Sequence, residues 1–540
     1  MHYFPLHTYN NLMSADASQA AADSGKDKVN LQTWLIALSV ILPTFIEVVD
    51  TTVVNVSLDH IRGSLSAGMD EVTWTLTSYL VSNAIIIPLT GWFCKLFGRK
   101  RYLIFSVALF TFSSFMCGVA WNLESLIFFR VMQGIGGGAL QPLSHAILFE
   151  TFPPRLHGLA MSVFGLGVVF APIIGPLLGG WVSDNWSWRW IFYINVPVGI
   201  IAIILNSIFI KDPPYMKKTK MRIDYAGLAL LVVGLGCLQI VLDKGQQEDW
   251  FASDFITVLT AISAISLIIF VVVENFIKQP VVDFSVFKDI TFSTGCTVMF
   301  AMYFSFMATI VLLPLYLQML MGYNSTLAGK VVGLGGLPML ITMPVVGVLV
   351  QKINPKYVLA VGVCLTSAAA YIFSELNLYA DFNAVLIPRI ILGVGAGCFF
   401  IPLMTLTMSH IRREQMSNAS GMFNLLRNTG GSIGISLSMT ILARSTQTTQ
   451  FDLIGRLNPF NLNYQNAVNS AVAFFSTKGI VGAAAKHAAE SSIYMELQRQ
   501  ASMLSFNKVS MITFFALILN LPLILIMRHK KGGEHVDSVH

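Results

Sequence analysis

Long apolar segments recur along almost the whole chain, and short polar stretches separate them. Each segment has roughly the 20 residues that an α-helix needs to cross a bilayer. The pattern predicts fourteen membrane-spanning helices, near residues 33–58, 72–93, 102–121, 124–148, 157–181, 190–210, 225–242, 254–274, 291–317, 326–350, 356–375, 383–409, 418–443 and 508–528. We therefore expect an all-α polytopic membrane protein.

Composition excludes the main alternatives. Of the 540 residues, 55% are hydrophobic and only 11% are charged, and the mean hydropathy is +0.68. A soluble domain carries about 25% charged residues, so this chain cannot cover a water-facing surface. The six cysteines have neither CxxC nor Cys/His spacing, which gives no indication of a metal site or a disulfide framework.

The basic residues are placed as in a membrane protein. The net charge is +6, but Lys and Arg gather at the ends of apolar runs, as in Lys95 to Arg101 and Lys211 to Arg222. Most of them fall on the side that carries both termini, and cytoplasmic loops are the ones enriched in Lys and Arg. We predict cytoplasmic termini, the bilayer as a partner and no nucleic-acid partner. No removable signal peptide is evident, so the first span should direct insertion.

An internal repeat divides the chain. The segment from Arg130 aligns with the segment from Arg389, with glycines at the same three later positions, and Gly91 to Lys100 resembles Gly347 to Lys356. Parallel repeats are typical of transporters that bind substrate between two halves. We predict a cytoplasmic tail (1–32), a six-helix bundle (33–210), a linker with two inserted helices (211–289), a second six-helix bundle (290–528) with an extracytoplasmic loop (444–507), and a tail (529–540).

Two acids lie inside the first predicted span. Glu47 and Asp50 are three residues apart, so they share one face of a helix. A charged acid near the bilayer centre costs roughly 2.5–3.5 kcal/mol on insertion scales, so each should face a cavity or a partner. Such a carboxyl group can bind and release a proton. The alternative is that one of them only pairs with an arginine for packing.

Arg130 stands near the start of the fourth predicted span. Its guanidinium stays charged at any working pH, so it can act as a fixed positive partner for a nearby carboxyl group. The alternative is a helix-end arginine that reaches the membrane interface. Gln133 and Gly134 follow it, and together with Asn55 of the first span they are candidates for the substrate pathway.

The fifth span is rich in small residues and prolines. Gly175 and Gly179 are four residues apart, which lets two helix backbones approach closely, and Pro172 and Pro176 bend or loosen the span. These residues are candidates for gating, and plain tight packing is the alternative.

A basic turn joins the second and third spans. Gly91 and Gly98 frame it, Gly98 suits a tight turn, and Arg99 and Lys100 hold the turn on the cytoplasmic side. These cations are also candidates for a latch to acids such as Glu150.

Several stretches together resemble a known family. They are Asp50 to Asn55, Gly91 to Lys100, Arg130 to Gly134, Ala171 to Gly180 and Trp190 to Gly199. The chain resembles the fourteen-helix drug/proton antiporters of the major facilitator superfamily, of the EmrB/QacA type and closest to EmrB-like multidrug exporters. The resemblance implies two six-helix bundles, export of hydrophobic or cationic compounds from a bacterial inner membrane, Asp50 as the protonation site and Arg130 as its electrostatic partner. No cofactor is implied other than the proton as coupling ion.

The resemblance also raises two particular questions. Where the superfamily usually has an acid in the turn motif, this chain has Lys95, which puts in doubt a gating role for an acid there. EmrB-like members work with a periplasmic adaptor and an outer-membrane channel. The loop at 444–507 is expected either to contact such an adaptor or to form a solvated cap.

Rival functions stay open at this point. Within transport, the rival is proton-linked movement of one dedicated metabolite or siderophore; the 38 Phe and 24 Met favour a wide cavity for many substrates. No HExxH motif and no cytoplasmic catalytic domain supports a membrane enzyme. Arg389 and Arg427 have no assigned role, and His145 is expected to be structural.

Overall fold

The computed structural model describes residues 30–212, 224–277, 280–455, 457–458 and 460–527. The predicted tails therefore lie almost entirely outside the described residues. Those residues form helices and connections, with no strand among them. The longer helices are α2 (Leu31–Val56), α5 (Trp74–Phe97), α6 (Arg99–Val119), α7 (Leu123–Gly137), α8 (Leu140–Thr151), α9 (His157–Asn185), α11 (Asn195–Phe209), α12 (Tyr225–Lys244), α13 (Asp254–Phe276), α14 (Ile290–Leu315), α15 (Ser325–Lys352), α16 (Pro355–Ser374), α17 (Phe382–Met408), α18 (Met416–Ile454), α19 (Leu462–Thr477) and α20 (Ala483–Ile518).

Shorter helices complete the chain, namely α3 (Leu58–Leu65), α4 (Met69–Val72), α10 (Trp190–Tyr193) and α21 (Leu521–Ile526). All fourteen predicted spans fall on helices, but not all are continuous. The fourth is divided into α7 and α8, next to a run of glycines that weakens a helix. The sixth is divided into α10 and α11. By length and composition, 11 helical segments among the described residues can cross a membrane, and α7–α8, α9 and α18 fall outside that set.

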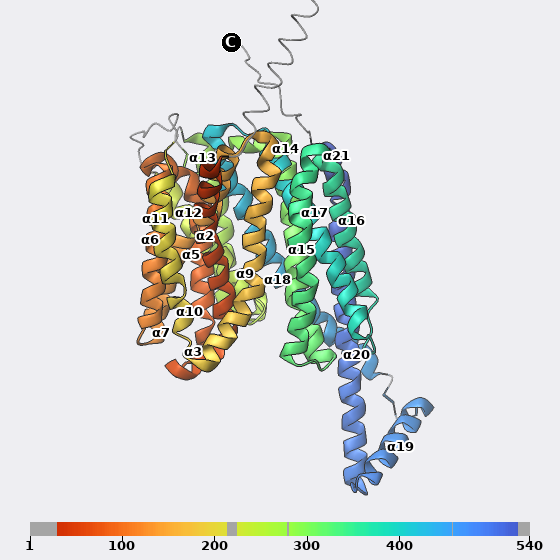
Figure 1. Cartoon of the computed structure of the whole chain (residues 1–540). Coiled ribbons are helices and arrows are strands. Elements are labelled where there is room, and N and C mark those ends of the chain that lie inside the picture. Colours follow the sequence, from red (N-terminus) through yellow and green to blue (C-terminus); the bar gives the residue numbers. More distant parts are fainter. Residues whose placement is uncertain (1–29, 213–223, 278–279, 456, 459, 528–540) are drawn as a thin grey trace, which may run out of the picture.

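The helices form two groups that stand side by side in Figure 1. In the first group α2 packs on α9 and α11, while α7 packs on α5 and α6. In the second group α14 packs on α18, α17 packs on α15 and α16, and α20 packs on α16 and α18. We refer to these groups as the first and second halves. The residue boundaries predicted for the halves and the linker stay predictions.

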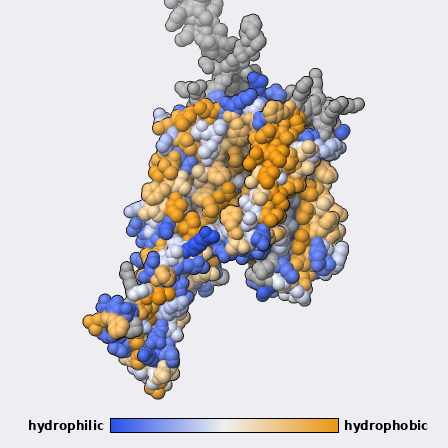
Figure 2. All heavy atoms as spheres, turned by 180° about the vertical axis from the view of Figure 1, so that it is seen from behind, coloured by the Kyte–Doolittle hydropathy of each residue, from blue (hydrophilic) through white to orange (hydrophobic). Residues whose placement is uncertain are grey.

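Apolar side chains cover the outside of the helices. Ile208 of α11 is 61% exposed and Ile268 of α13 is 65% exposed. Figure 2 shows a broad hydrophobic band across the middle of the molecule, with hydrophilic residues gathered toward both ends. This distribution fits a bilayer around the middle of the helices and water at both ends.

The two ends of the helices differ in how the halves meet. We call the end that carries the α5–α6 turn the turn end and the opposite end, where α3 lies, the loop end. At the turn end a Cβ atom added to Gly91 of α5 would lie 2.8 Å from Cα of Asn418 in α18. A Cβ atom added to Gly158 of α9 would overlap Val350 of α15. The halves are therefore in close backbone contact at the turn end.

The inserted helices touch both halves. Thr77 of α5 donates a hydrogen bond to Asp243 of α12, near the loop end. On the other side, Gln239 Nε2 of α12 lies 3.2 Å from Ser432 Oγ of α18. The α12–α13 pair thus bridges the first half and the second half.

The segment predicted as an extracytoplasmic loop is largely helical. Helix α18 continues to Ile454, α19 follows, and α20 begins at Ala483 and runs on into the last predicted span. Helix α20 thus begins before the predicted start of that span at residue 508, which stays a prediction. A search for apolar runs does not detect helices that are rich in Ser, Thr, Gln and Ala. In Figure 1, α19 and the adjoining part of α20 project beyond the other helices at the loop end.

Candidate functional site

Helix α2 carries both predicted acids into the interior of the first half. Asp50 is 1% exposed and Glu47 is 4% exposed. The apolar sequence around them forms the helix, and side chains from α5, α7, α8 and α11 surround their face. Buried carboxylates need hydrogen-bond donors or a cation, because burial removes their hydration. The two acids find different partners.

Asp50 lies at the centre of a charged cluster. Arg130 Nη1 of α7 lies 2.5 Å from Asp50 Oδ2, and the Arg130 side chain is fully buried. Gln133 Nε2, one turn further along α7, donates to Asp50 Oδ1 at 2.9 Å. Asn195 Nδ2 of α11 donates to the same oxygen at 2.8 Å. Arg130 therefore faces an acid inside the bundle and does not reach the membrane interface.

The guanidinium of Arg130 is held on several sides. Its Nε donates to the backbone carbonyl of Thr75 at 3.0 Å, and its Nη1 also donates to Gln133 Oε1 at 2.8 Å. Its carbon Cζ lies 4.2 Å from the centroid of the Tyr79 ring. An aromatic face of this kind attracts a desolvated cation. The cation is therefore held in place by the backbone, an amide and an aromatic ring as well as by the carboxylate.

Glu47 lies one turn earlier on α2 and accepts from neutral donors. The donor atoms are Tyr79 Oη at 3.2 Å, Asn83 Nδ2 at 3.3 Å and Gln141 Nε2 of α8 at 2.8 Å. The amide oxygen of Gln141 accepts a hydrogen bond from Arg427 of α18, in the second half. Glu47 is therefore linked to a cation of the other half through one amide group.

A narrow crevice lies where the halves meet next to Glu47. Asn83, Gln141, Asn424, Arg427 and Asn428 are among the side chains that line it. These residues come from α5 and α8 on one side and from α18 on the other. The lining thus brings an acid of the first half, Glu47, and a cation of the second half, Arg427, to the same crevice.

His145 also takes part in the contact between the halves. Its Nδ1 lies 3.0 Å from Asn424 Nδ2 of α18, and the histidine is fully buried. Its ring packs edge-on against Phe164 at 4.3 Å between centroids. This packing agrees with the structural role expected for His145.

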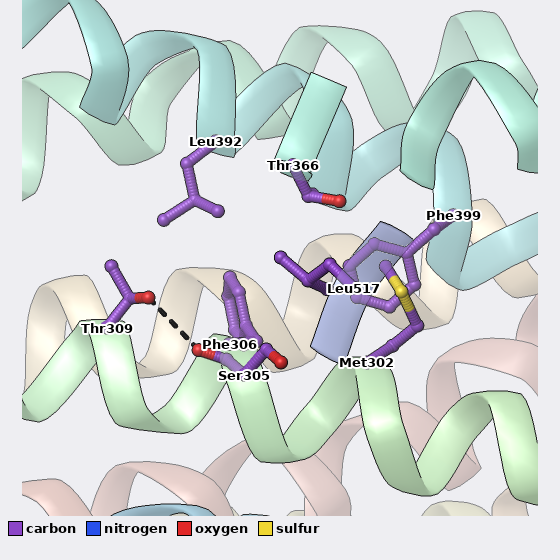
Figure 3. Close-up of a pocket in the computed structure, with 8 residues that line it drawn as sticks. All are labelled: Met302, Ser305, Phe306, Thr309, Thr366, Leu392, Phe399 and Leu517. Carbon is purple, nitrogen blue, oxygen red and sulfur yellow. Dashed lines mark hydrogen bonds between the residues drawn. The ribbon is translucent and has the colours of Figure 1, made fainter. Parts of the chain in front are cut away.

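The second half holds a small pocket between helices that are the predicted repeat partners of those around Asp50. Its lining residues are Met302, Ser305, Phe306, Thr309, Thr366, Leu392, Phe399 and Leu517. They come from α14, α16, α17 and α20. Figure 3 shows apolar side chains converging on this space, with the hydroxyl group of Thr309 turned back to the carbonyl of Ser305 at 3.0 Å. No ionisable side chain is among the eight.

Arg389, the repeat partner of Arg130, has a different environment. It lies on α17 and is 7% exposed, but it donates no hydrogen bond to any described residue. Its side chain packs against Gly335 of α15, where a Cβ atom would overlap it. The repeat thus keeps the arginine without the acid.

The predicted gating residues of the fifth span lie on α9, against α2. A Cβ atom added to Gly175 would overlap Thr52, and one added to Gly179 would lie 2.8 Å from Val56 Cγ2. The small residues therefore permit close approach of the two helices. Pro172 and Pro176 lie within α9, but their side chains are outside the described part of the structure. Gly134 of α7 permits a similar approach to Tyr79 and Ser82 of α5.

The basic turn forms contacts with both halves. Gly98 has a φ of 87°, which favours glycine. Arg99, 2% exposed, pairs with Glu150 of α8, and its Nη2 donates to Ser417 Oγ of α18 at 3.3 Å. Lys100 Nζ donates to the backbone carbonyl of Ser207 at 2.6 Å. Arg99 thus makes the contact with Glu150 that was considered for a latch.

Lys95 lies near Asp283, an acid that does not belong to the first half. Asp283 follows the inserted helices, and Asn418 Nδ2 donates to its backbone carbonyl at 2.7 Å. Burial acts to raise the pKa of Asp283, but hydrogen bonds from Ser285 and the charge of Lys95 outweigh it and leave the pKa below its usual value. The connection between the inserted helices and the second half therefore supplies an acid near Lys95.

The sequence predicted part of the site: Asp50, Arg130 and Gln133 lie together in the structure. Asn55 is exposed and lies apart from the cluster. Tyr79, Asn83, Gln141 and Asn195 were not among the predicted site residues. Their only signal is a polar side chain inside an apolar span, which is common in membrane helices.

Comparison with known proteins identifies the family. Residues 40–435 match the family described as the Major Facilitator Superfamily. The chain belongs to this superfamily. It is therefore a multi-pass membrane protein of a family of transporters.

Relatives and solved structures agree with this assignment. The chain is 38% identical to the multidrug export protein EmrB of Haemophilus influenzae, over 79% of this chain and 84% of that protein. It is 34% identical to the fatty acid resistance protein FarB of Neisseria gonorrhoeae, over 93% and 97%. Its fold is similar to that of the human organic anion transporter MFSD10, with a TM-score of 0.57, 13% identity and coverage of 91% and 100%.

Proposed function

We propose that this protein exports hydrophobic or cationic compounds in exchange for protons, by alternating access. The observation that carries the proposal is the fully buried ion pair between Asp50 and Arg130. Acids inside membrane spans are costly, and in transporters they mark proton pathways. Multidrug export proteins with 36–38% identity support export as the direction of transport.

Asp50 is the proposed proton carrier. While it is ionised, Arg130, Gln133 and Asn195 satisfy its two oxygens. When Asp50 binds a proton, Arg130 loses its counter-charge, so the surrounding helices favour another arrangement. Because each state of the carboxyl group favours a different arrangement of α2 and α7, proton binding shifts the balance between them.

The alternative of one dedicated metabolite or siderophore differs in substrate breadth. Several fixed polar groups favour one substrate, whereas apolar surfaces rich in Phe and Met accept many. The relatives include a protein named for fatty acid resistance as well as multidrug exporters. A competition assay with unrelated lipophilic cations separates the two possibilities.

The proposed setting is a bacterial inner membrane with cytoplasmic termini. The turn end then faces the cytoplasm and the loop end faces outward. The projecting α19 and α20 would lie where a periplasmic adaptor, together with an outer-membrane channel, could contact the protein. Exposed apolar residues such as Phe474, at 54%, are available there for such a contact.

The proposal is tested with Asp50→Asn in proteoliposomes, with tetraphenylphosphonium as substrate. We expect the wild type to show substrate-induced proton flux and the variant to lose it at least tenfold. Asp59→Asn is the matched control, since Asp59 lies on α3 with its side chain 76% exposed. Proton flux in Asp50→Asn equal to that of wild type would exclude Asp50 as the coupling site.

A further inference from the structure

Arg427 is a buried cation that the proposed proton carrier does not use. It is 3% exposed and lies in the middle of α18, in the second half. No carboxylate among the described residues lies within ion-pair distance of it. Its Nε and Nη2 donate to Asn428 Oδ1 at 3.3 and 3.2 Å, and its Cζ lies 5.3 Å from the centroid of the Tyr303 ring. These neutral groups hold the side chain against the second half.

The remaining contact of Arg427 crosses to the first half. Its Nη2 donates to Gln141 Oε1, and Gln141 Nε2 donates to Glu47 Oε2 at 2.8 Å. The amide of Gln141 therefore has its oxygen toward a cation and its nitrogen toward an acid. Charges at both ends polarise such a chain and strengthen it. We call this chain of Glu47, Gln141 and Arg427 the amide bridge.

Protonation of Glu47 weakens the amide bridge. A hydrogen bond to a charged group is roughly twice as strong as one between neutral groups. A neutral Glu47 therefore loses much of its hold on the Gln141 amide, and Gln141 loses the polarisation that favours Arg427. The bridge joins α2 and α8 to α18, so its loss removes an attraction between the halves. The contacts of Glu47 with Tyr79 and Asn83 lie within the first half. The packing of the halves at Gly91 does not depend on the bridge.

We propose that Arg427 is a positioning residue for proton coupling: through Gln141 it joins the two halves while Glu47 is ionised and releases them when Glu47 binds a proton. This inference rests on the proposed function: an exporter that exchanges its substrate for protons takes up each proton from outside, at the loop end. The halves are in close contact at the turn end in this structure, where Gly91 meets Asn418, nine residues before Arg427 on α18. Release of the bridge would therefore favour opening of the turn end, where substrate loads.

Other charged and titratable groups near Glu47 also affect how the measured distances depend on pH. Asp50 lies on the same helix, Tyr79 and Arg130 come from α5 and α7, and His145 of α8 reaches α18 through Asn424. None of them occupies the bridge itself. Their effects are separated by variants that change only Glu47, Gln141 or Arg427.

The test measures the distance between the halves at the turn end as a function of pH. Spin labels are placed at Arg101→Cys on α6 and Lys352→Cys on α15, both exposed, with Cys237 and Cys364 replaced by serine. Electron-resonance distance measurements are made on the full chain in lipid nanodiscs between pH 5.5 and 8. We expect the wild type to show a separated population that grows as the pH falls.

The variants distinguish the bridge from a purely structural role. At pH 8, Glu47→Gln and Arg427→Met should each raise the separated population at least threefold and flatten the pH profile. The double variant should resemble either single variant, and Arg427→Lys should recover part of the pH dependence. Arg389→Met, which removes another buried arginine of the second half, should keep the wild-type profile.

Two results would overturn the inference. One is a wild-type pH profile in Arg427→Met, and the other is an additive effect of Glu47→Gln and Arg427→Met. If Arg427→Met does not fold, Gln141→Leu interrupts the same bridge and is judged by the same two criteria. Loss of proton flux in Asp50→Asn together with an unchanged Arg427→Met would reject the bridge and keep the proposed function. Absence of flux in the wild type would reject the proposed function itself.

Discussion

Corresponding helices of the two halves enclose very different interiors. In the first half, α2, α6, α7 and α11 surround Asp50, Arg130, Gln133 and Asn195. In the second half, their repeat partners α14, α16, α17 and α20 surround the small apolar pocket of Figure 3. Gln133 follows Arg130 by three residues, and Leu392 follows Arg389 by three. The same helix arrangement thus serves an ionisable centre in one half and an apolar one in the other.

The difference shows that the arrangement of helices does not by itself determine whether a half encloses a buried acid. Arg130 is stabilised by a carboxylate, whereas Arg389 lacks a hydrogen bond to any described residue. A buried cation with a partner and one without should respond differently to removal. The comparison therefore makes definite predictions for paired substitutions in the two halves.

The largest expected difference is between Arg130→Met and Arg389→Met. Arg130→Met leaves the Asp50 carboxylate buried without its cation, which should lower the free energy of unfolding by about 3–5 kcal/mol. Arg389→Met removes no hydrogen bond and should change it by less than about 1 kcal/mol. Thermal unfolding of the purified proteins, followed by tryptophan fluorescence, measures both. Equal melting temperatures for the two variants would contradict the comparison.

An intermediate effect is expected when each residue three positions after an arginine is replaced by its counterpart, as in Gln133→Leu and Leu392→Gln. Gln133→Leu removes hydrogen bonds to both Asp50 and Arg130, and bonds to charged groups are worth roughly 1.5–3 kcal/mol each. We expect lower stability and at least a tenfold loss of substrate-induced proton flux. Leu392→Gln places an amide in the apolar pocket, which should lower stability but leave the flux within about twofold of wild type. A larger loss of proton flux in Leu392→Gln than in Gln133→Leu would contradict the proposal that the first half carries the proton.

The smallest expected effect concerns helix approach in the first half. Gly175→Ala places a methyl group against Thr52 of α2, and overpacking of this kind costs about 1–3 kcal/mol. Gly180 has open space around its Cα, so Gly180→Ala should leave the melting temperature unchanged or raise it slightly. Both variants are measured in the same unfolding assay. A similar drop for both would mean that the close contact of α9 with α2 does not limit stability.

Much of the fold could be predicted because apolar length decides where helices cross a bilayer. Each predicted span lies on a helix, and Asp50 and Arg130 were recognisable as charges inside apolar segments. The division between α7 and α8 was not recognised, because it depends on a local run of glycines. The helices between residues 444 and 507 were missed because they are polar.

The partners within the site could not be predicted to the same degree. Asn195 and Gln141 are neutral amides, and such residues occur in many spans without a functional contact. Which acid each one meets depends on the packing of helices that are distant in sequence. Arg427 had no assigned role for the same reason, since its contact with Gln141 forms only where α8 and α18 meet.

The inserted α12–α13 pair limits how the protein could be shortened. Because α12 forms hydrogen bonds with Thr77 in one half and with Ser432 in the other, it links the two halves. Deleting residues 225–276 would therefore remove a connection between the halves and leave these polar groups of α5 and α18 without their partners on α12.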